Sequence, residues 1–279
     1  MTTIAVTGVT GRLGGRVAHR LAAAGVTQRL IARDPARAPR LAGATVARAE
    51  YGDAEAVSRA LDGVGAVLMV SAAETPDRVE RHRAFVDAAL AAGVGHLVYI
   101  SFYGASPTAT FTLARDHWAT EEHIRATGLP FTFLRDNLYA DFLPSMVGED
   151  GVIRGPAGQG RVSVVAQDDI ADVAAAVVRA PGGHAGRSYD LTGPEDLTFA
   201  EIAAVIGSAT GRRVTYRPET LEEAYAFRAS YGAPAWQVDA WVSTYTAIAA
   251  GEMEGVSTAV PDVAGRPATS LADLLRNAR

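Results

Sequence analysis

The glycine-rich segment Gly8-Val9-Thr10-Gly11-Arg12-Leu13-Gly14 constrains the fold of this chain more than any other feature. It follows a short apolar run and precedes a run of helix-forming composition, so it predicts a tight turn from a strand into a helix. Such a turn lets the backbone approach phosphate, while the helix N-terminus offers unpaired N–H donors. An ordinary tight turn without a ligand is the alternative. The residues expected to bind the pyrophosphate of a dinucleotide are Gly8, Thr10, Gly11, Arg12, Leu13 and Gly14.

The first half of the chain repeats this alternation of strand and helix. The expected strands are residues 4–7, 29–32, 45–47, 66–70, 97–101 and 131–134. The expected helices are residues 13–24, 54–61, 77–92 and 114–127, three of which end at Gly25, Gly93 and Gly128. This pattern predicts an α/β fold, a Rossmann-type doubly wound parallel sheet.

Glycine and proline become frequent after Arg135, so we expect the chain to leave the sheet there. Residues 1–135 are the predicted dinucleotide-binding core, and residues 161–193 are expected to return to it with a helix at 168–179 and a strand at 188–192. The predicted substrate-binding lobe, a smaller α+β carboxy-terminal lobe, comprises residues 136–160 and 194–279. It includes an expected helix at 199–209 and an expected strand at 214–217.

Composition removes several chemistries. The chain has no cysteine and no lysine, so all 26 basic residues are arginine, and thiolate catalysis and Schiff bases are excluded. The net charge of -5 argues against a nucleic-acid partner or an anionic membrane. The start, Met1-Thr2-Thr3, lacks the basic and apolar regions of a signal peptide, so we expect a cytoplasmic protein with a small-molecule partner. No metal-ligand spacing appears, so no metal is expected, and homodimer formation stays open.

The end of the second expected strand decides the cofactor. NAD-binding domains usually place an acidic residue roughly 20 to 25 residues after the first glycine of the motif, where it bonds the ribose 2′-hydroxyl. Here Ala32 and Arg33 stand at that point, and Asp34 follows at the start of the loop before Pro35. Because a guanidinium pairs with a 2′-phosphate, Arg33 predicts NADP(H).

Three small residues end later strands at the edge where the nicotinamide should lie. Ser71 and Ala72 follow the fourth expected strand, and Ser101 ends the fifth. They are expected to contact the cofactor, although serines at strand ends also serve as caps. Asp53, before the helix at 54–61, is open to two interpretations, a helix N-cap or an adenine contact.

The resemblance to a known family rests on an ordered set of motifs. These are Thr7-Gly8-Val9-Thr10-Gly11-Arg12-Leu13-Gly14, Ala32-Arg33-Asp34-Pro35, Tyr99-Ile100-Ser101-Phe102, and Thr120-Glu121-Glu122-His123-Ile124-Arg125 running into Phe131-Thr132-Phe133-Leu134-Arg135-Asp136-Asn137. Over residues 1–193 the chain resembles the NmrA-like branch of atypical short-chain dehydrogenases/reductases. This branch includes NAD(P)H-dependent quinone reductases, a triphenylmethane dye reductase, azoreductase-like enzymes and redox-sensing regulators.

The catalytic Tyr-x-x-x-Lys of ordinary short-chain reductases is missing. Aligning the family pattern on Glu121 places Leu113 at the Tyr position and His117 at the Lys position. The resemblance therefore implies that His117 bonds the nicotinamide ribose or acts as a weak acid. The alternative is a polar helix residue packed beside Trp118.

Without that acid, a simple ketone is difficult to reduce, whereas a quinone yields a weakly basic hydroquinone anion. By resemblance, the segment from Asn137 to Phe142 passes over the nicotinamide. Asn137 is then a candidate ligand of the carboxamide or the substrate, Tyr139 and Phe142 are candidates for stacking on a planar acceptor, and Tyr103 is a further candidate proton donor. Each has loop packing as its alternative.

The leading hypothesis is an NADPH-dependent reductase of quinones or related conjugated aromatic acceptors, with direct hydride transfer and no flavin. One alternative is a non-enzymatic NADP(H) sensor that binds a protein partner. Another is an epimerase or dehydratase, which the missing Tyr-Lys pair disfavours.

Overall fold

The computed structural model describes residues 2–277, which divide into two compact units. Unit 1 contains the chain up to Phe102 together with Asp116–Arg135 and Gln167–Tyr189. Unit 2 contains Tyr103–Arg115, Asp136–Ala166 and the chain from Asp190 onward. Relative to the lobes expected from the sequence, residues 103–115, 161–166 and 190–193 fall in unit 2 rather than with the core.

Unit 1 is built on a seven-stranded sheet with the strand order β3-β2-β1-β4-β5-β6-β9. The strands are β1 (Thr3–Val6), β2 (Gln28–Ala32), β3 (Ala44–Arg48), β4 (Val64–Met69), β5 (His96–Phe102), β6 (Phe131–Asp136) and β9 (Arg187–Leu191). β1 pairs in parallel with both β2 and β4, β2 with β3, and β4 with β5. The chain order reverses between β1 and β4, which is where open α/β sheets bind ligands.

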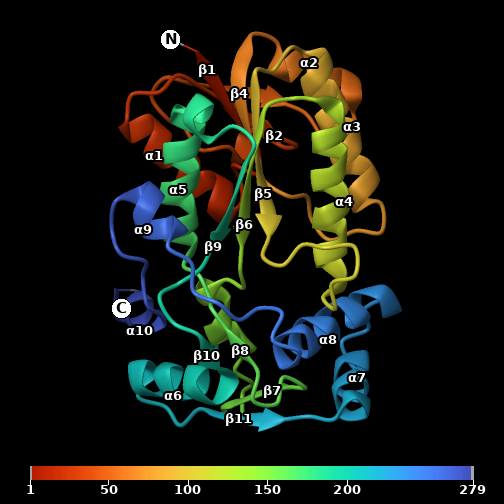
Figure 1. Cartoon of the computed structure of the whole chain (residues 1–279), viewed down its shortest axis with the longest axis vertical. Helices are drawn as coiled ribbons and strands as arrows, with labels where there is room; N and C mark the ends of the chain where they lie inside the picture. Colours follow the sequence, from red (N-terminus) through yellow and green to blue (C-terminus); the bar gives the residue numbers. More distant parts are fainter. Residues whose placement is uncertain (1, 278–279) are drawn as a thin grey trace. The chain divides into compact units, whose positions relative to one another are not determined.

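Helices cover both faces of this sheet (Figure 1). α1 (Arg12–Ala23) and α5 (Gln167–Arg179) pack together on one face. α2 (Ala54–Leu61), α3 (Arg78–Ala91) and α4 (Thr112–Thr127) lie on the other. The predicted α/β Rossmann-type fold is confirmed.

Apolar burial and glycine turns explain why these helices form and end where they do. Fully buried side chains of Phe85, Leu97 and Phe133 belong to one apolar cluster between the sheet and its helices. The predicted stops at Gly25, Gly93 and Gly128 are confirmed: each glycine has a φ of 70° to 73°, the left-handed conformation that side chains disfavour. The glycine turn is therefore held on a well-packed support.

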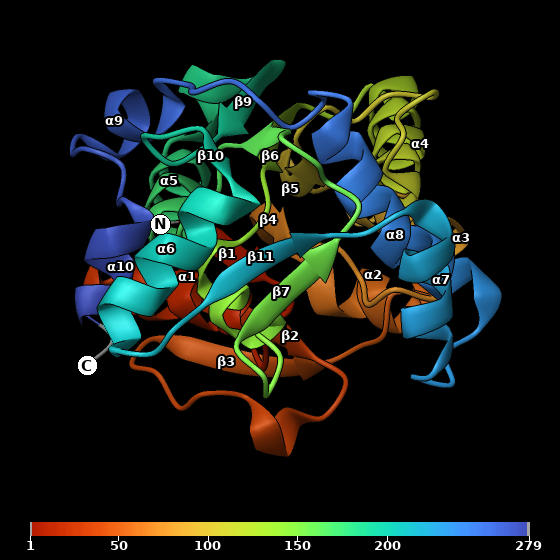
Figure 2. The same cartoon turned by 90° about the horizontal axis from the view of Figure 1, so that it is seen from below.

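Unit 2 contains two small sheets. β7 (Val152–Gly155) pairs in parallel with β11 (Thr215–Pro218), as Figure 2 shows, and β8 (Arg161–Val162) pairs antiparallel with β10 (Leu197–Thr198). Its helices are α6 (Phe199–Thr210), α7 (Leu221–Ala229), α8 (Ala235–Ala249), α9 (Ala259–Ala264) and α10 (Leu271–Asn277). Short 3-10 turns lie at Pro35–Arg37 and Pro181–His184 in unit 1 and at Ala140–Met146 in unit 2.

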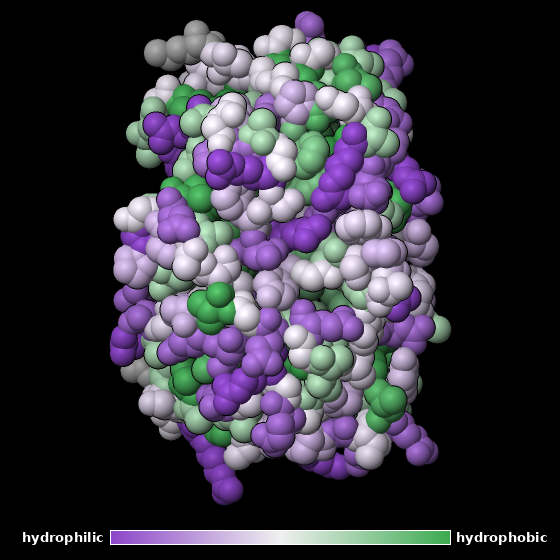
Figure 3. All heavy atoms as spheres, viewed as in Figure 1, coloured by the Kyte–Doolittle hydropathy of each residue, from purple (hydrophilic) through white to green (hydrophobic). Residues whose placement is uncertain are grey.

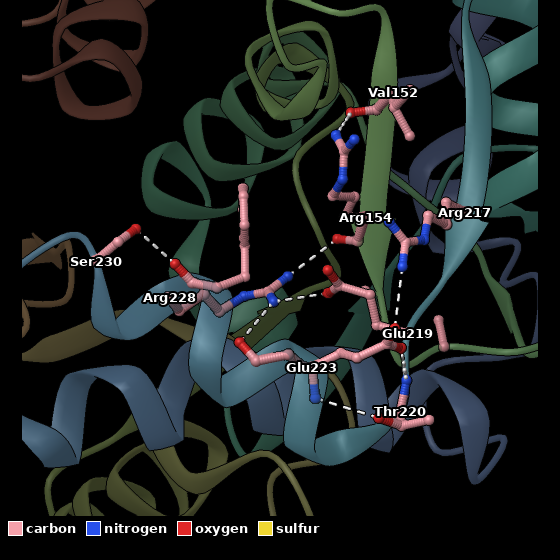
Figure 4. Close-up of polar contacts among 12 residues, drawn as sticks. Val152, Arg154, Arg217, Glu219, Thr220, Glu223, Arg228 and Ser230 are labelled. Carbon is pink, nitrogen blue, oxygen red and sulfur yellow. Dashed lines mark hydrogen bonds and ion pairs between the residues drawn. The ribbon is translucent and has the colours of Figure 1, made fainter.

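Arg228 of α7 forms a buried ion pair with Glu219, which follows β11, and a hydrogen bond to β7 within unit 2 (Figure 4). The Arg228 guanidinium lies 3.0 Å from Glu219 Oε2 and also donates to the carbonyl oxygen of Arg154 at 3.0 Å. Both charged side chains are almost inaccessible to solvent. Removing either partner would leave an uncompensated buried charge, so this pair fixes the local arrangement.

The surface is mixed in polarity. On the face drawn in Figure 3, apolar residues are scattered among polar ones rather than gathered into one large patch. Among residues 2–277, no helix combines the length and the apolar character needed to cross a membrane.

Candidate functional site

The glycine turn has a shape that only glycine permits. Gly8 has a φ of 64°, and the Gly11 N–H donates to the Gly8 carbonyl oxygen at 2.9 Å. A Cβ atom on Gly14 would lie 2.4 Å from that same oxygen. This contact is a clash, and a backbone oxygen cannot move aside as a flexible side chain can. The absence of side chains thus lets β1 and α1 approach closely.

The N-terminus of α1 is open to an anion. Gly11 caps the helix without a side-chain hydrogen bond, and the first turn carries no acidic residue. The first bond of the helix runs from Gly15 N to the Gly11 carbonyl oxygen, so the N–H groups of Arg12, Leu13 and Gly14 are donors without helical partners. Thr10 beside them is exposed. These residues fit a pyrophosphate, which would take up the unpaired donors and the positive end of the helix dipole.

Arg33 stands at the same edge of the sheet as this turn. Val6, the last residue of β1, pairs in parallel with Leu30, and β2 ends two residues later at Ala32, so both carboxyl ends lie at this edge. Arg33 is exposed and forms no ion pair among the described residues, whereas Asp34 accepts a hydrogen bond from Ala36 N at 3.1 Å and caps a 3-10 turn. One oxygen of the Asp34 carboxylate is thus used in the cap, and the Arg33 guanidinium remains available for a 2′-phosphate.

The segment after β4 lies against the turn and is held by side chains. A Cβ on Gly8 would lie 3.0 Å from the Val70 Cβ. Thr7 Oγ1 accepts the Val70 N–H at 2.9 Å, and the Tyr51 hydroxyl donates to the Val70 carbonyl oxygen at 2.5 Å. Both polar groups of Val70 are therefore fixed.

The next peptide groups are held from α3. The Ala72 N–H donates to His82 Nε2 at 2.8 Å, and Arg78 Nε donates to the Ala72 carbonyl oxygen at 3.1 Å. Ser71, between the two clamped residues, is half-buried and forms no hydrogen bond that the structure records. This arrangement leaves the predicted cofactor contact Ser71 free on a fixed support.

His117 lies in a buried polar cluster of unit 1. Arg78 Nη2 is 3.1 Å from His117 Nε2, and Tyr99 Oη is 3.0 Å from His117 Nδ1. Burial and the Arg78 charge hold the pKa of His117 well below its ordinary value, and they lower the pKa of His82 to about 3. His117 is thus a neutral ring with both nitrogens engaged, and this geometry does not support the predicted ribose contact or proton donation.

Ser101 and Glu121 lie in a second buried network. Ser101 is fully buried, and its hydroxyl donates to Glu121 Oε1 at 2.6 Å. Arg125 and Arg135 both donate to the same carboxylate. The hydrogen of the Ser101 hydroxyl is therefore used, and because the residue is inaccessible, the geometry does not support the predicted cofactor contact through this side chain.

The remaining candidates belong to unit 2. Asn137 is fully buried, and its amide nitrogen donates to Ser163 Oγ and to the Met253 carbonyl oxygen, both at 3.0 Å. Both amide hydrogens are therefore used inside the unit, so the geometry does not support the predicted contact with ligand.

The two candidate tyrosines of unit 2 are less enclosed. The Tyr103 hydroxyl donates to the Glu254 carbonyl oxygen at 2.8 Å, and burial raises its pKa. The Tyr139 hydroxyl donates to Asp136 Oδ2 at 2.9 Å, and its ring is half-buried. Phe142 is 54% exposed, so its ring has room to meet a planar molecule. The catalytic roles given to Tyr103 and Tyr139 stay predictions.

Comparison with known families agrees with this arrangement of turn, strand ends and helices. The NmrA-like family matches residues 1–228. The chain belongs to the NmrA-like family. The resemblance predicted from the motifs is thereby confirmed, and it extends beyond residue 193.

Several curated proteins resemble this NmrA-like chain over nearly its full length. Quinone oxidoreductase 2 of Escherichia coli is 34% identical over 277 residues, covering 97% of this chain and 96% of the relative. Its structure with NADPH superposes with a TM-score of 0.89 over 99% of both chains. An NAD(P)H azoreductase of Xenophilus azovorans is 32% identical and covers 98% of this chain and 96% of the relative.

A triphenylmethane reductase offers a second structural comparison for this NmrA-like chain. The Citrobacter sp. enzyme, solved with NADP(H), is 32% identical and has a TM-score of 0.87, covering 99% of this chain and 100% of that one. These three relatives are named as oxidoreductases or reductases and match nearly the whole chain, so this member of the family is an oxidoreductase as predicted.

Sequence reasoning missed the side chains that hold the 70–72 segment. Tyr51, Arg78 and His82 belong to no motif, and His82 is fully buried. A buried His flanked by arginines on a predicted helix was the available signal. For Asp53, the N-cap interpretation is confirmed, because its carboxylate accepts from Ala56 N at 2.9 Å.

Proposed function

We propose that this chain is an NADPH-dependent reductase of quinones or related conjugated aromatic acceptors. The observation that carries this proposal is the open N-terminus of α1 at the same sheet edge as the unpaired, exposed Arg33. Oxidoreductase relatives that match nearly the whole chain support the enzyme over the sensor alternative.

The residues of unit 1 bind and orient the cofactor. The glycine turn holds the pyrophosphate, Arg33 holds the 2′-phosphate, and Ser71 faces the nicotinamide half. When bound, the nicotinamide supplies a hydride to the acceptor. Because hydrogen bonds fix the backbone of residues 70–72, this segment can hold the nicotinamide ring in one position.

The acceptor class follows from the missing acid. The chain has no lysine, Leu113 stands at the family's Tyr position, and His117 is neutral and engaged on both ring nitrogens. A ketone would yield a strongly basic alkoxide that needs such an acid, whereas a quinone yields a weakly basic anion that water protonates. We propose that the rings of Tyr139 and Phe142 stack on this planar acceptor.

The relatives act on small molecules, and a small planar substrate is proposed here too. Homodimer formation, the lack of a nucleic-acid or membrane partner and the cytoplasmic location stay predictions from the sequence.

A panel of acceptors tests the proposal. Purified protein with NADPH and no added flavin is mixed separately with benzoquinones, naphthoquinones, azo dyes and aldehydes, and loss of nicotinamide absorbance is followed against a blank without protein. We expect quinones to be reduced much faster than aldehydes. If NADPH binds but no acceptor is consumed faster than the blank, the sensor alternative stands and the reductase proposal falls.

A further inference from the structure

One guanidinium connects the cofactor edge of unit 1 to the buried cluster around His117. Arg78 is the first residue of α3, which lies beside the sheet in Figure 1. Its Nε donates to the Ala72 carbonyl oxygen at 3.1 Å, and its Nη2 lies 3.1 Å from His117 Nε2. The same side chain therefore holds both the backbone after β4 and a ring on α4.

The contact with Arg78 fixes the tautomer of His117. A guanidinium only donates hydrogen bonds, so His117 Nε2 must accept and the ring proton must lie on Nδ1. From there it donates to Tyr99 Oη at 3.0 Å. The imidazole of His117 is consequently held in one orientation and one tautomer.

The second histidine of the cluster follows the same logic. The backbone N–H of Ala72 donates to His82 Nε2, so the proton of His82 also lies on Nδ1, where it donates to Thr120 Oγ1 at 2.9 Å. Thr120 in turn donates to the Asp116 carbonyl oxygen at 2.8 Å. The Ala72 peptide is thus clamped on both sides by groups that are themselves clamped.

Burying the Arg78 guanidinium costs free energy that its contacts compensate only in part. It is 5% exposed, its Nη1 has no hydrogen-bond partner among residues 2–277, and the Asp116 carboxylate is 3.8 Å away. A buried ion pair is weak evidence for stabilisation, because replacing the whole pair by well-packed apolar side chains is often neutral or stabilising. The arrangement therefore points to a role other than stabilising the fold.

We propose that Arg78 is a positioning residue for the cofactor, which fixes the Ala72 peptide beside the glycine turn and holds His117 as its Nδ1–H tautomer. The proposal rests on the function proposed above, since it takes residues 70–72 as the support of the nicotinamide half. Arg78 acts through the Ala72 backbone, without itself touching the reacting atoms, and the tautomer of His117 reports the contact that holds the guanidinium in place.

The first test uses the protein without cofactor. In ¹⁵N-labelled wild type, the imidazole nitrogens of His117 should show Nδ1 protonated and Nε2 unprotonated. In Arg78→Gln, the guanidinium donor is lost and we expect a mixture of tautomers. The matched control is Arg83→Gln, which removes an exposed charge from the same helix and should leave the His117 signals unchanged. Identical His117 signals in wild type and Arg78→Gln would overturn the proposal.

The second test measures cofactor binding and turnover. We expect the NADPH Kd of Arg78→Gln to rise roughly tenfold, with a smaller fall in kcat at saturating NADPH, because the support is loosened rather than the chemistry removed. Arg78→Lys keeps the charge but cannot reach Ala72 and His117 together, so it should also bind NADPH weakly. An NADPH Kd for either variant equal to that of Arg83→Gln would contradict a positioning role.

Folding and function are kept apart by this design. If Arg78→Gln does not fold, Arg78→Lys carries both measurements because the buried charge is retained. If wild-type protein reduces no acceptor, the proposed function fails, while the tautomer and NADPH-binding measurements still decide the role of Arg78.

Discussion

The glycine turn and the buried cluster of Arg78, His82 and His117 serve the same edge of unit 1 by opposite means. The turn works through what it lacks, because a single Cβ on Gly14 would collide with the Gly8 oxygen. The cluster works through side chains that are nearly inaccessible and bond one another and the Ala72 peptide. The glycine turn keeps N–H donors available for a ligand. In the cluster, the donors are used in hydrogen bonds to the Ala72 backbone and to neighbouring side chains.

The glycine turn and the buried cluster should therefore be sensitive to different changes, the turn to added atoms and the cluster to changes of charge. Backbone shape at the turn tolerates no added atom, since no side chain can move aside. The cluster tolerates changes of shape better than changes of charge, because its neutral histidines lie beside a buried cation. Substitution and pH should therefore act on the two regions differently.

Adding one carbon at Gly14 should break the turn. The Cβ of Gly14→Ala would lie 2.4 Å from the Gly8 oxygen and 2.5 Å from the Thr7 oxygen. We expect a loss of about 3 kcal/mol in the free energy of unfolding and loss of measurable NADPH binding. Urea unfolding and a fluorescence titration with NADPH measure the two effects. Gly182→Ala, where the Cβ meets nothing within 4 Å, is the control. Wild-type stability and affinity in Gly14→Ala would show that the turn can relax.

Acid should destabilise the cluster. The pKa of His82 falls from 6.5 to about 3 on folding, mainly through burial and then through Arg78. Between these values the unfolded chain binds a proton that the folded chain does not, so stability is full above pH 6.5 and declines as pH falls. At pH 5 the loss is about 2 kcal/mol for this one histidine.

Replacing His82 tests that assignment. His82→Gln keeps an acceptor for the Ala72 N–H but removes the titration, so the fall in unfolding free energy from pH 7 to pH 5 should be smaller than in wild type. His19→Gln removes an exposed histidine and should leave the pH dependence unchanged. Parallel pH curves for wild type and His82→Gln would mean that His82 is not the group responsible.

The same contrast explains how far the sequence could be interpreted. Strand and helix periodicity and the glycine spacing predicted the fold and the phosphate turn, because each depends on residues adjacent in the chain. The clamps on Val70 and Ala72 come from Thr7, Tyr51, Arg78 and His82, which only the folded sheet brings together. For the same reason, Ser101 and Asn137 looked like ligand contacts, although buried partners far along the chain occupy their side chains.

The smallest effect should come from replacing Arg33, the exposed charge beside the glycine turn. Arg33 is exposed and without an ion pair among the described residues, so Arg33→Asp should fold normally and lose its attraction for a 2′-phosphate. We expect the ratio of NADPH to NADH affinity to fall about tenfold, since solvent screens an exposed charge-assisted bond. Arg212→Asp makes the same charge change in unit 2 and should leave the ratio intact. An unchanged ratio in Arg33→Asp would mean that the turn alone selects the dinucleotide, without help from the neighbouring strand.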